Sequence, residues 1–327
     1  MKKSLSLLVI VGVVSVMVMF QGCKKATLPV LATTEVSAVT LNSASSGGDI
    51  TSDGGEDIIA RGVCWNTTGD PTITNSKTTD GKGSGAFTSS MAGLQKGSVY
   101  YVSAYATNSV GTAYGEQVIF STQIDDVDGN NYNTTPVGTQ IWMAENLKTT
   151  LYNDNTQIPN VTLNATWAAL TTPAYSWAQN DEATYKPLYG AIYNWYAVAT
   201  GKLCPTGWHV PSDADFSAME INLGMTVAQA GALEWRGTDQ GKQLKSTTGW
   251  NTGENGTNTS GFNALPSGYR AHTTGIFEGL GLINYNWTAT EQDAAVALYR
   301  RLDGNNDAVY RGATFKRAGK SVRCVKD

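Results

Sequence analysis

The chain has 327 residues, enough for two ordinary domains that each bury a hydrophobic core. Its formal net charge is −4, and Lys and Arg form no runs longer than pairs, so we expect no binding to nucleic acid. Only 15% of the residues are charged, while Gly, Thr, Asn and Ser are abundant, which favours a mostly β protein of the cell exterior over a helical cytosolic enzyme.

The N-terminal segment predicts an export signal. Lys2 and Lys3 precede an apolar run, Leu7 to Phe20, which as a helix would span about 21 Å and so fall short of the ~30 Å hydrocarbon core of a membrane. We therefore expect residues 1–22 to be a cleaved signal peptide. The stretch "FQGC" resembles the lipobox of bacterial lipoproteins, in which the cysteine, here Cys23, is acylated. An ordinary signal peptide with an incidental cysteine is the alternative.

Acylation of Cys23 would anchor the protein to a membrane surface, with residues 23–28 as a linker. We expect the bacterial outer membrane. The residues "KKATLP" that follow Cys23 contain no acidic cluster of the kind that marks surface export in some Gram-negative groups. Both the periplasmic face and the cell-surface face are therefore left open.

Residues 29–122 predict a β-sandwich, because short alternating runs are separated by turn signals such as "SSGGDI" and "TDGKGSG". In "VYYVSAYAT" the alternation places two sets on opposite faces: Tyr101, Ser103, Tyr105 and Thr107 against Tyr100, Val102, Ala104 and Ala106. The stretches "ITSDGGEDIIARGVCWN", "GSGAFTSSMAGL" and "YATNSVGTAYGE" resemble the fibronectin type III-like, immunoglobulin-like modules of Bacteroidetes-type lipoproteins. That resemblance implies a spacer. Cys64 is expected to be a free, buried and inert thiol.

Residues 123–327 predict a second, α+β domain that holds eight of the nine tryptophans. "DGNNYNTTPVGTQIWMAENLKTT" is typical of a hairpin and a following strand, with "DGN" as the turn. "PSDADFSAMEINLG" predicts a helix with Ser212 as N-cap and Asp215 completing a capping box. A weaker helical stretch covers "TVAQAGALEW", and "GKQLKS" could add a turn. The remainder is expected to form strands and polar loops.

The second domain resembles the major paralogous domain family first named from Fibrobacter succinogenes. The stretches that carry the resemblance include "GTQIWMAENLKTT", "YGAIYNWYAV", "GKLCPTGWHVPSDADF", "GFNALPSGYR" and "SVRCVKD". More distantly it resembles the C-type-lectin-like fold of formylglycine-generating and sulfatase-modifying proteins. Such folds tie the segment before the helix to the last strand, which implies a Cys204–Cys324 disulfide. An export route and the positions of the other two cysteines fit this pairing. Free thiols or a reactive cysteine are the alternative.

Metal and catalytic sites have little support in the sequence. His209 is expected to be half buried and hydrogen-bonded to backbone, and a Cys-His dyad would require Cys204 to be unpaired. His209 and His272 are the only histidines and no Cys-x-x-Cys spacing occurs, so zinc is not expected. "DDVDGNN" fails the EF-hand spacing and predicts a plain turn. We predict no catalytic residue, no metal and no cofactor.

The candidate ligand-binding residues lie in two stretches. "ALPSGYR" supplies Tyr269 and Arg270, and "NWTATE" supplies Trp287 and Glu291; the lectin-like resemblance implies binding loops near these last strands. The E-P-N, Q-P-D and W-N-D motifs of calcium-dependent lectins are absent from the sequence.

The sequence as a whole predicts a lipid-anchored envelope protein whose second domain is a non-catalytic binding or adhesion module for a glycan or a surface protein. Two alternatives stay open. One is an enzyme related to formylglycine-generating proteins, which would need a free, accessible cysteine or a metal site. The other is a purely structural envelope component.

Overall fold

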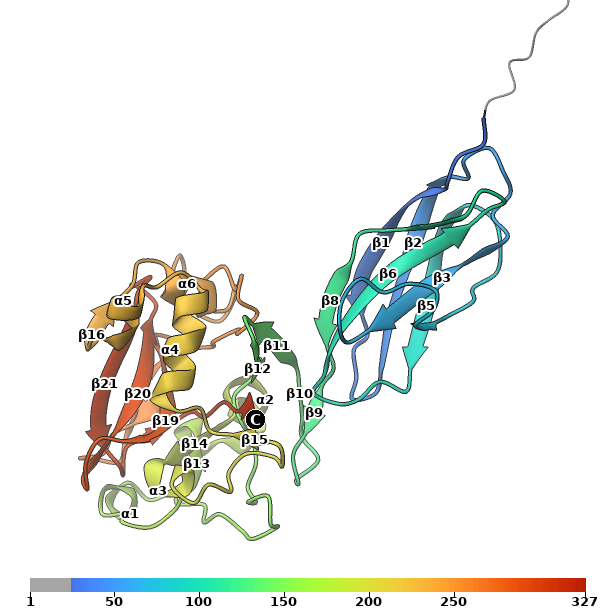
Figure 1. Ribbon diagram of the computed structural model, residues 1–327. Coiled ribbons are helices and arrows are strands. Elements are labelled where there is room, and N and C mark those ends of the chain that lie inside the picture. Colours follow the sequence, from blue (N-terminus) through green and yellow to red (C-terminus); the bar gives the residue numbers. More distant parts are fainter. Residues whose placement is uncertain (1–24) are drawn as a thin grey trace, which may run out of the picture.

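The computed structural model describes residues 25–327, so the expected signal peptide and Cys23 lie outside the described residues. The fold is mostly β and consists of a β-sandwich followed by a larger domain with helices (Figure 1). Among the described residues, no helix is both long and apolar enough to cross a membrane.

The sandwich pairs two antiparallel sheets. One contains β1 (Val30–Ser37), β2 (Ser43–Ser52) and β5 (Gly85–Ala92). The other contains β3 (Ala60–Asn66), β4 (Ser76–Lys77), β6 (Val99–Thr107), β7 (Thr112–Tyr114) and β8 (Val118–Ser121). Strand β6 follows the predicted alternation, because Tyr100, Val102 and Ala104 enter the core between the sheets.

Cys64 is free and buried, as the sequence predicted. Its thiol lies 3.4 Å from the Pro71 carbonyl and 3.5 Å from the Ser103 carbonyl. Desolvation raises the pKa of the Cys64 thiol to about 11, so it carries little thiolate at neutral pH.

A short hairpin, β9 (Ile124–Asp125) with β10 (Asn131–Tyr132), leads out of the sandwich. Within it, the Asp126 carboxylate accepts hydrogen bonds from Asn130 and from the Tyr132 hydroxyl. The Asp128 carboxylate accepts from the backbone and hydroxyl of Thr150. These acids therefore hold the turn and its neighbour in place with protein donors.

The second domain contains two larger sheets. The smaller consists of β11 (Thr134–Val137), β12 (Gln140–Met143), β23 (Val325–Lys326) and β15 (Trp208–His209). The larger runs in the order β13 (Tyr175–Trp177), β14 (Ala191–Asn194), β22 (Gly319–Lys320), β17 (Ser267–Arg270), β19 (Ile283–Glu291), β20 (Val296–Asp303), β21 (Val309–Phe315) and β16 (Glu234–Arg236). Strand β18 (Phe277–Leu280) pairs with β17.

The helices of this domain are short. They are α1 (Asn164–Ala168), α2 (Glu182–Tyr189), α3 (Trp195–Val198), α4 (Asp213–Asn222), α5 (Val227–Gly231) and α6 (Gln240–Leu244), with a 3₁₀ turn, η1, at Ala178–Asn180. Helix α4 begins as predicted, because the Ser212 and Asp215 side chains form the capping box. Phe216 and Met219 of α4 are buried.

The prediction of one helical stretch over "TVAQAGALEW" was wrong at its end. Helix α5 stops at Gly231, and Glu234, with φ of 63°, begins strand β16. Trp235 pairs with Tyr310 of β21, so pairing with a distant strand overrides the local helical pattern. The sequence analysis also missed α2, whose Asp181 cap precedes a stretch with little apolar periodicity.

A buried carboxylate fastens α4 to the larger sheet. Glu220 is fully buried and accepts from the Arg236 guanidinium at 2.6 Å and from Arg300 Nε at 2.8 Å. At the start of the helix, Asp213 binds Arg300 at 2.6 Å and Arg311 at 2.7 Å. Figure 1 shows α4 alongside the strands that carry these arginines. Helix α4 thus covers part of one face of the larger sheet, and these ion pairs hold it there.

The disulfide implied by the family resemblance is present. Cys204 and Cys324 are bonded, with their Cα atoms 5.9 Å apart and 120 residues apart in sequence. The bond joins the segment before β15 to the segment before β23, and both cysteines are buried. A Cys-His dyad of Cys204 with His209 is therefore excluded, because Cys204 carries no free thiol.

Replacing Cys204 and Cys324 together by alanine is expected to lower the free energy of unfolding of the second domain by about 2–5 kcal/mol, because the unfolded chain loses a long cross-link. Urea unfolding followed by tryptophan fluorescence measures this. Cys64→Ala, in the sandwich, is the matched control and should leave that transition in place. An unchanged midpoint in the double variant would contradict the structural role.

Glu220→Ala is expected to cost about 3–5 kcal/mol, because it leaves the buried Arg236 without a carboxylate and removes one of the two carboxylates that bind Arg300. The control is Glu182→Ala, which removes an exposed pair with Lys186 on α2 and should change stability little. Thermal unfolding of both variants provides the comparison. Equal, small losses would show that the buried pair does not hold α4.

Candidate functional site

The larger sheet has two different faces, because side chains alternate along each strand. On β20, Arg300 and Leu302 point toward α4, where Arg300 binds Glu220 and Leu302 joins the core under the helix. Tyr299 and Arg301 therefore point to the opposite face. At the β16 end of that face, Trp235 is 37% exposed.

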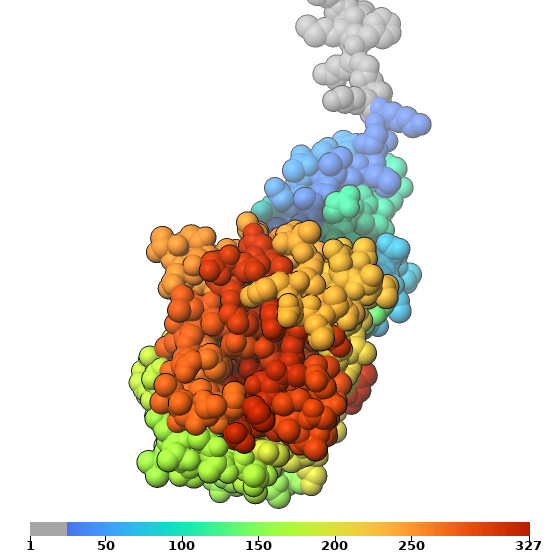
Figure 2. Space-filling view, turned by 90° about the vertical axis from the view of Figure 1, so that its left-hand side faces the viewer, coloured from blue at the N-terminus to red at the C-terminus, as the bar shows by residue number. Residues whose placement is uncertain are grey.

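A continuous row of aromatic rings crosses this face, and we call it the aromatic band. Its members are Trp235, Tyr310, Tyr299, Tyr285 and Tyr269, from β16, β21, β20, β19 and β17. Successive ring centroids lie 5.3, 6.0, 5.2 and 4.9 Å apart. Figure 2 looks at the side of the domain where the orange and red segments that carry these strands reach the surface, with recesses between their side chains.

The middle of the band requires a glycine. Gly312 on β21 lies opposite Tyr299. A Cβ atom there would come within 2.7 Å of the Tyr310 ring and 3.2 Å of the Tyr299 hydroxyl. The missing side chain therefore gives the two tyrosines the room to stack at an interplanar angle of 19°.

A pit of about 260 Å³ opens at the β17 end of the band. Its walls include Tyr269, Tyr285 and Tyr299, together with His272, Glu278, Thr314 and Lys320. The volume is just below the roughly 300–1,000 Å³ of drug-sized sites, so the pit suits a ligand of about one sugar ring.

Lys320 lies among the rings. Its Nζ is 3.7 Å from the centroid of Tyr285, 4.2 Å from that of Tyr299 and 5.2 Å from that of Trp287. The residue is 2% exposed, and within residues 25–327 no carboxylate or carbonyl accepts a hydrogen bond from Nζ. Desolvation, aided by the charge of Arg301, holds the Lys320 pKa well below its usual value, while the ring faces partly offset this through cation–π attraction.

The other polar groups around the pit are mostly engaged. The Tyr269 hydroxyl donates to Glu278, and Arg301 binds Asp303 through two contacts of 2.5 Å. Burial, with Glu278 adding to it, raises the pKa of Tyr269 to about 12, so this phenol stays a donor at neutral pH. The His272 pKa is lowered by burial and by the charges of Arg317 and Lys320. Lys320 and Arg317 therefore both oppose a positive charge on His272.

The structure brings two of the four predicted ligand-binding residues together. Tyr269 lines the pit, and Trp287 is a fully buried ring beside Lys320. Arg270 points elsewhere: it is buried, donates to the carbonyls of Val161, Thr162 and Gly275, and stacks 4.4 Å from Trp167. Glu291 binds Lys316 at 2.7 Å and does not line the pit.

Sequence reasoning missed Lys320 and Glu278. Lys320 lies four residues before Cys324 in the last buried segment of the chain, where an unpaired lysine is unusual. This position in a buried segment was the only feature of the sequence that could have pointed to Lys320.

The expectation for His209 was wrong. Its side chain, 44% exposed, binds two carboxylates and, among the described residues, no backbone group. Its Nδ1 lies 2.7 Å from the Asp327 carboxylate and its Nε2 3.3 Å from that of Asp215. His209 thus links the end of the chain to the N-terminus of α4. In residues 25–327 no group of three or more His, Cys, Asp or Glu side chains is placed to hold a metal ion.

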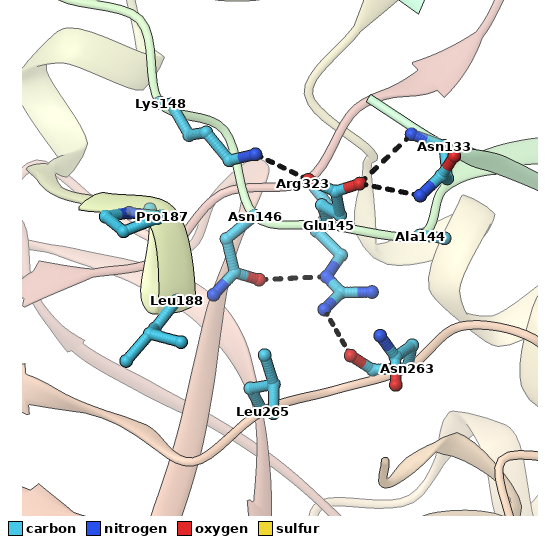
Figure 3. A pocket seen from close by; sticks show the side chains of 11 residues that line it. Asn133, Ala144, Glu145, Asn146, Lys148, Pro187, Leu188, Asn263, Leu265 and Arg323 are labelled. Atoms are coloured by element: carbon cyan, nitrogen blue, oxygen red, sulfur yellow. Dashed lines mark hydrogen bonds and ion pairs between the residues drawn. The ribbon is translucent and has the colours of Figure 1, made fainter. Parts of the chain in front are cut away.

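Another cavity, of about 320 Å³, is lined by polar groups that satisfy one another (Figure 3). Arg323 donates to Asn146 at 2.9 Å and to the Asn263 carbonyl at 3.0 Å. Glu145 lies between Lys148 and Asn133 and accepts from both. This cavity therefore offers a ligand fewer unpartnered groups than the pit does.

A groove of about 610 Å³ lies between the sandwich and the second domain. Lys96 and Asp125 on its wall are paired, and Lys326 donates to the Gly97 carbonyl at 2.8 Å. Trp208 packs against Gly97, where a Cβ atom would approach its ring to 3.0 Å. These contacts join the two domains.

Comparison with known proteins identifies one family. The profile described as "Fibrobacter succinogenes major domain" matches residues 136–326, more than half of the chain. No curated protein matches the chain.

Solved structures give weaker similarities. The sensor domain of the anti-sigma factor RsgI4 in Pseudobacteroides cellulosolvens is 14% identical, over 29% of this chain and 93% of that one, with a TM-score of 0.23. A myokine structure is 19% identical, over 28% and 95%, with a TM-score of 0.22. Domains A168–A170 of titin are 21% identical, over 29% and 32%, with a TM-score of 0.20. TM-scores this low carry no argument about fold or function.

Lys320→Met is expected to stabilise the protein by about 1–3 kcal/mol, because it removes a buried polar group that has no partner while keeping a side chain of similar length. The control is Lys316→Met, where the ammonium is bonded to Glu291 at 2.7 Å and to the Ala294 carbonyl at 2.9 Å, so stability should fall. Thermal unfolding separates the two. A loss of stability in both variants would make Lys320 a structural residue.

Proposed function

The chain belongs to the Fibrobacter succinogenes major domain family, and we propose that it is a non-catalytic binding protein of the cell envelope whose ligand is a glycan. The aromatic band with its pit is the binding face in this proposal. The observation that carries it is the row of five rings across five strands, partly exposed at both ends, next to a pit of about 260 Å³.

Sugar chemistry suits such a face. The C–H surface of a pyranose ring is apolar and packs on aromatic rings, whereas its hydroxyls need planar polar side chains nearby. Trp235 and Tyr269 supply partly exposed rings at the two ends of the band. Arg301 lies between them, 5.6 Å from the Trp235 ring, and is paired with Asp303. A sugar that stacks on either end of the band would therefore lie near the charged groups of Arg301 or Glu278.

The rest of the chain has a supporting role in this proposal. The sandwich is a spacer of the fibronectin type III type, and the second domain is of the C-type-lectin-like type. Cys23 is the lipid attachment site, which anchors the protein to the bacterial outer membrane after export. The first described residues lie at the end of the sandwich away from the second domain, which supports a spacer that holds the binding face off the membrane (Figure 1).

The enzyme alternative needed a free, accessible cysteine or a metal site in the second domain. Both cysteines of that domain are in the disulfide, so no observation favours this alternative. The purely structural alternative predicts no glycan binding at all, which makes it an outcome of the test that follows.

Trp235→Ala is expected to weaken glycan binding at least about tenfold, or about 1.4 kcal/mol, because it removes the exposed ring at the open end of the band. A glycan array first identifies the ligand, and titration calorimetry then measures the variants. Tyr114→Ala removes an equally exposed aromatic ring from the sandwich and should bind as well as the unmodified protein. No array signal, or equal losses in both variants, would contradict the proposal.

A further inference from the structure

We infer that the pit recognises a carboxylate, so that the glycan bound by this protein contains uronic acid residues whose carboxylate pairs with Lys320. This inference rests on the proposed function and specifies its ligand. It follows from the partners that Lys320 lacks, from the charges around the pit and from the shape of the pit.

The first observation is a contrast among buried lysines. Residues 25–327 contain three: Lys245, Lys316 and Lys320. The ammonium of Lys245 donates to three backbone carbonyls at 2.8 to 3.2 Å, and that of Lys316 binds Glu291 and a carbonyl. Buried ammonium groups are normally satisfied in this way. Lys320 has no such acceptor within the described chain, and it lines a pit that a ligand can enter.

The second observation is the charge balance. Glu278 is the acid on the pit wall, and it already accepts the Tyr269 hydroxyl. Asp303 is held by Arg301 through both of its oxygens. Neither acid lies within ion-pair distance of Lys320, so the ammonium remains uncompensated. A carboxylate that entered the pit would favour the charged form of Lys320 and form a charge-assisted hydrogen bond with it.

The third observation is the number and kind of donors. Besides Lys320, Tyr299 lines the pit, and no hydrogen bond within the described residues engages its hydroxyl. A single amine on the pit wall suits a ligand with one negative charge, such as a carboxylate. Phosphate is usually held by bidentate arginines or by the N-terminus of a helix, and neither lines the pit. The ring walls of Tyr269 and Tyr285 suit the apolar face of the sugar that carries the carboxylate.

The test compares each acidic oligosaccharide with its own methyl ester, which keeps the sugar and removes the charge. The probes are oligomers of galacturonic, glucuronic and mannuronic acid, measured by titration calorimetry on the purified protein. We expect at least one acid to bind ten times or more tightly than its ester. Lys320→Met should reduce the ratio of acid to ester affinity to about one. Lys202→Met, which removes an exposed lysine far in sequence from the pit, is the charge-matched control and should keep the preference.

The outcomes separate the two proposals. If acid and ester bind equally and Trp235→Ala weakens both, the band binds glycans but the carboxylate inference is wrong. If the Lys320→Met variant still prefers the acid, the inference is also wrong, because a group other than Lys320 then binds the carboxylate. If the protein binds neither the acids, the esters nor any neutral glycan on an array, both proposals fail.

Discussion

The contact on which the second domain depends is the buried carboxylate of Glu220, held between Arg236 and Arg300. Arg236 belongs to β16 and Arg300 to β20, so one side chain of α4 fixes two strands of the larger sheet that are separated by β21. Because side chains alternate along a strand, committing Arg300 to the helix side commits its neighbours Tyr299 and Arg301 to the other side. The alternation of side chains along β20 therefore places the ion pairs with Glu220 on one face of the sheet and the aromatic band on the other.

Lys320, which lies beside the aromatic band, is expected to lower the stability of the fold. A protein selected for stability alone would place an apolar residue at position 320, since a desolvated amine with no protein acceptor in the described chain is unfavourable. The surrounding rings reduce this cost through cation–π attraction but provide no hydrogen bond. Locally unfavourable groups that the rest of a structure supports are typical of binding and catalytic sites. Lys320 therefore differs from Lys245 and Lys316, whose ammonium groups donate to acceptors within the protein.

Local patterns in the sequence were sufficient for local structure. The capping box of Ser212 and Asp215 and the alternation in β6 were both predictable, because each depends on residues within a few positions of one another. The Cys204–Cys324 bond came from the family resemblance and fits the four-cysteine inventory. By contrast, β16 replaced a predicted helix because Trp235 pairs with Tyr310, some 75 residues away by number. The site itself depends on such distant pairings, since Lys320 meets Tyr285 and Tyr299 only once β22 has joined the sheet.

The central claim is that ligands bind at the aromatic band, and ¹⁹F NMR of protein labelled with fluorotryptophan tests it most directly. Trp235 lies at one end of the band and Trp287 lies beside Lys320, while Trp65 in the sandwich and Trp250 in the core under α4 report on places away from the band. On addition of a bound uronic acid oligosaccharide, the Trp235 and Trp287 resonances should shift and those of Trp65 and Trp250 should stay in place. Shifts confined to Trp65 or Trp250 would contradict the account, because they would place the binding surface elsewhere on the protein.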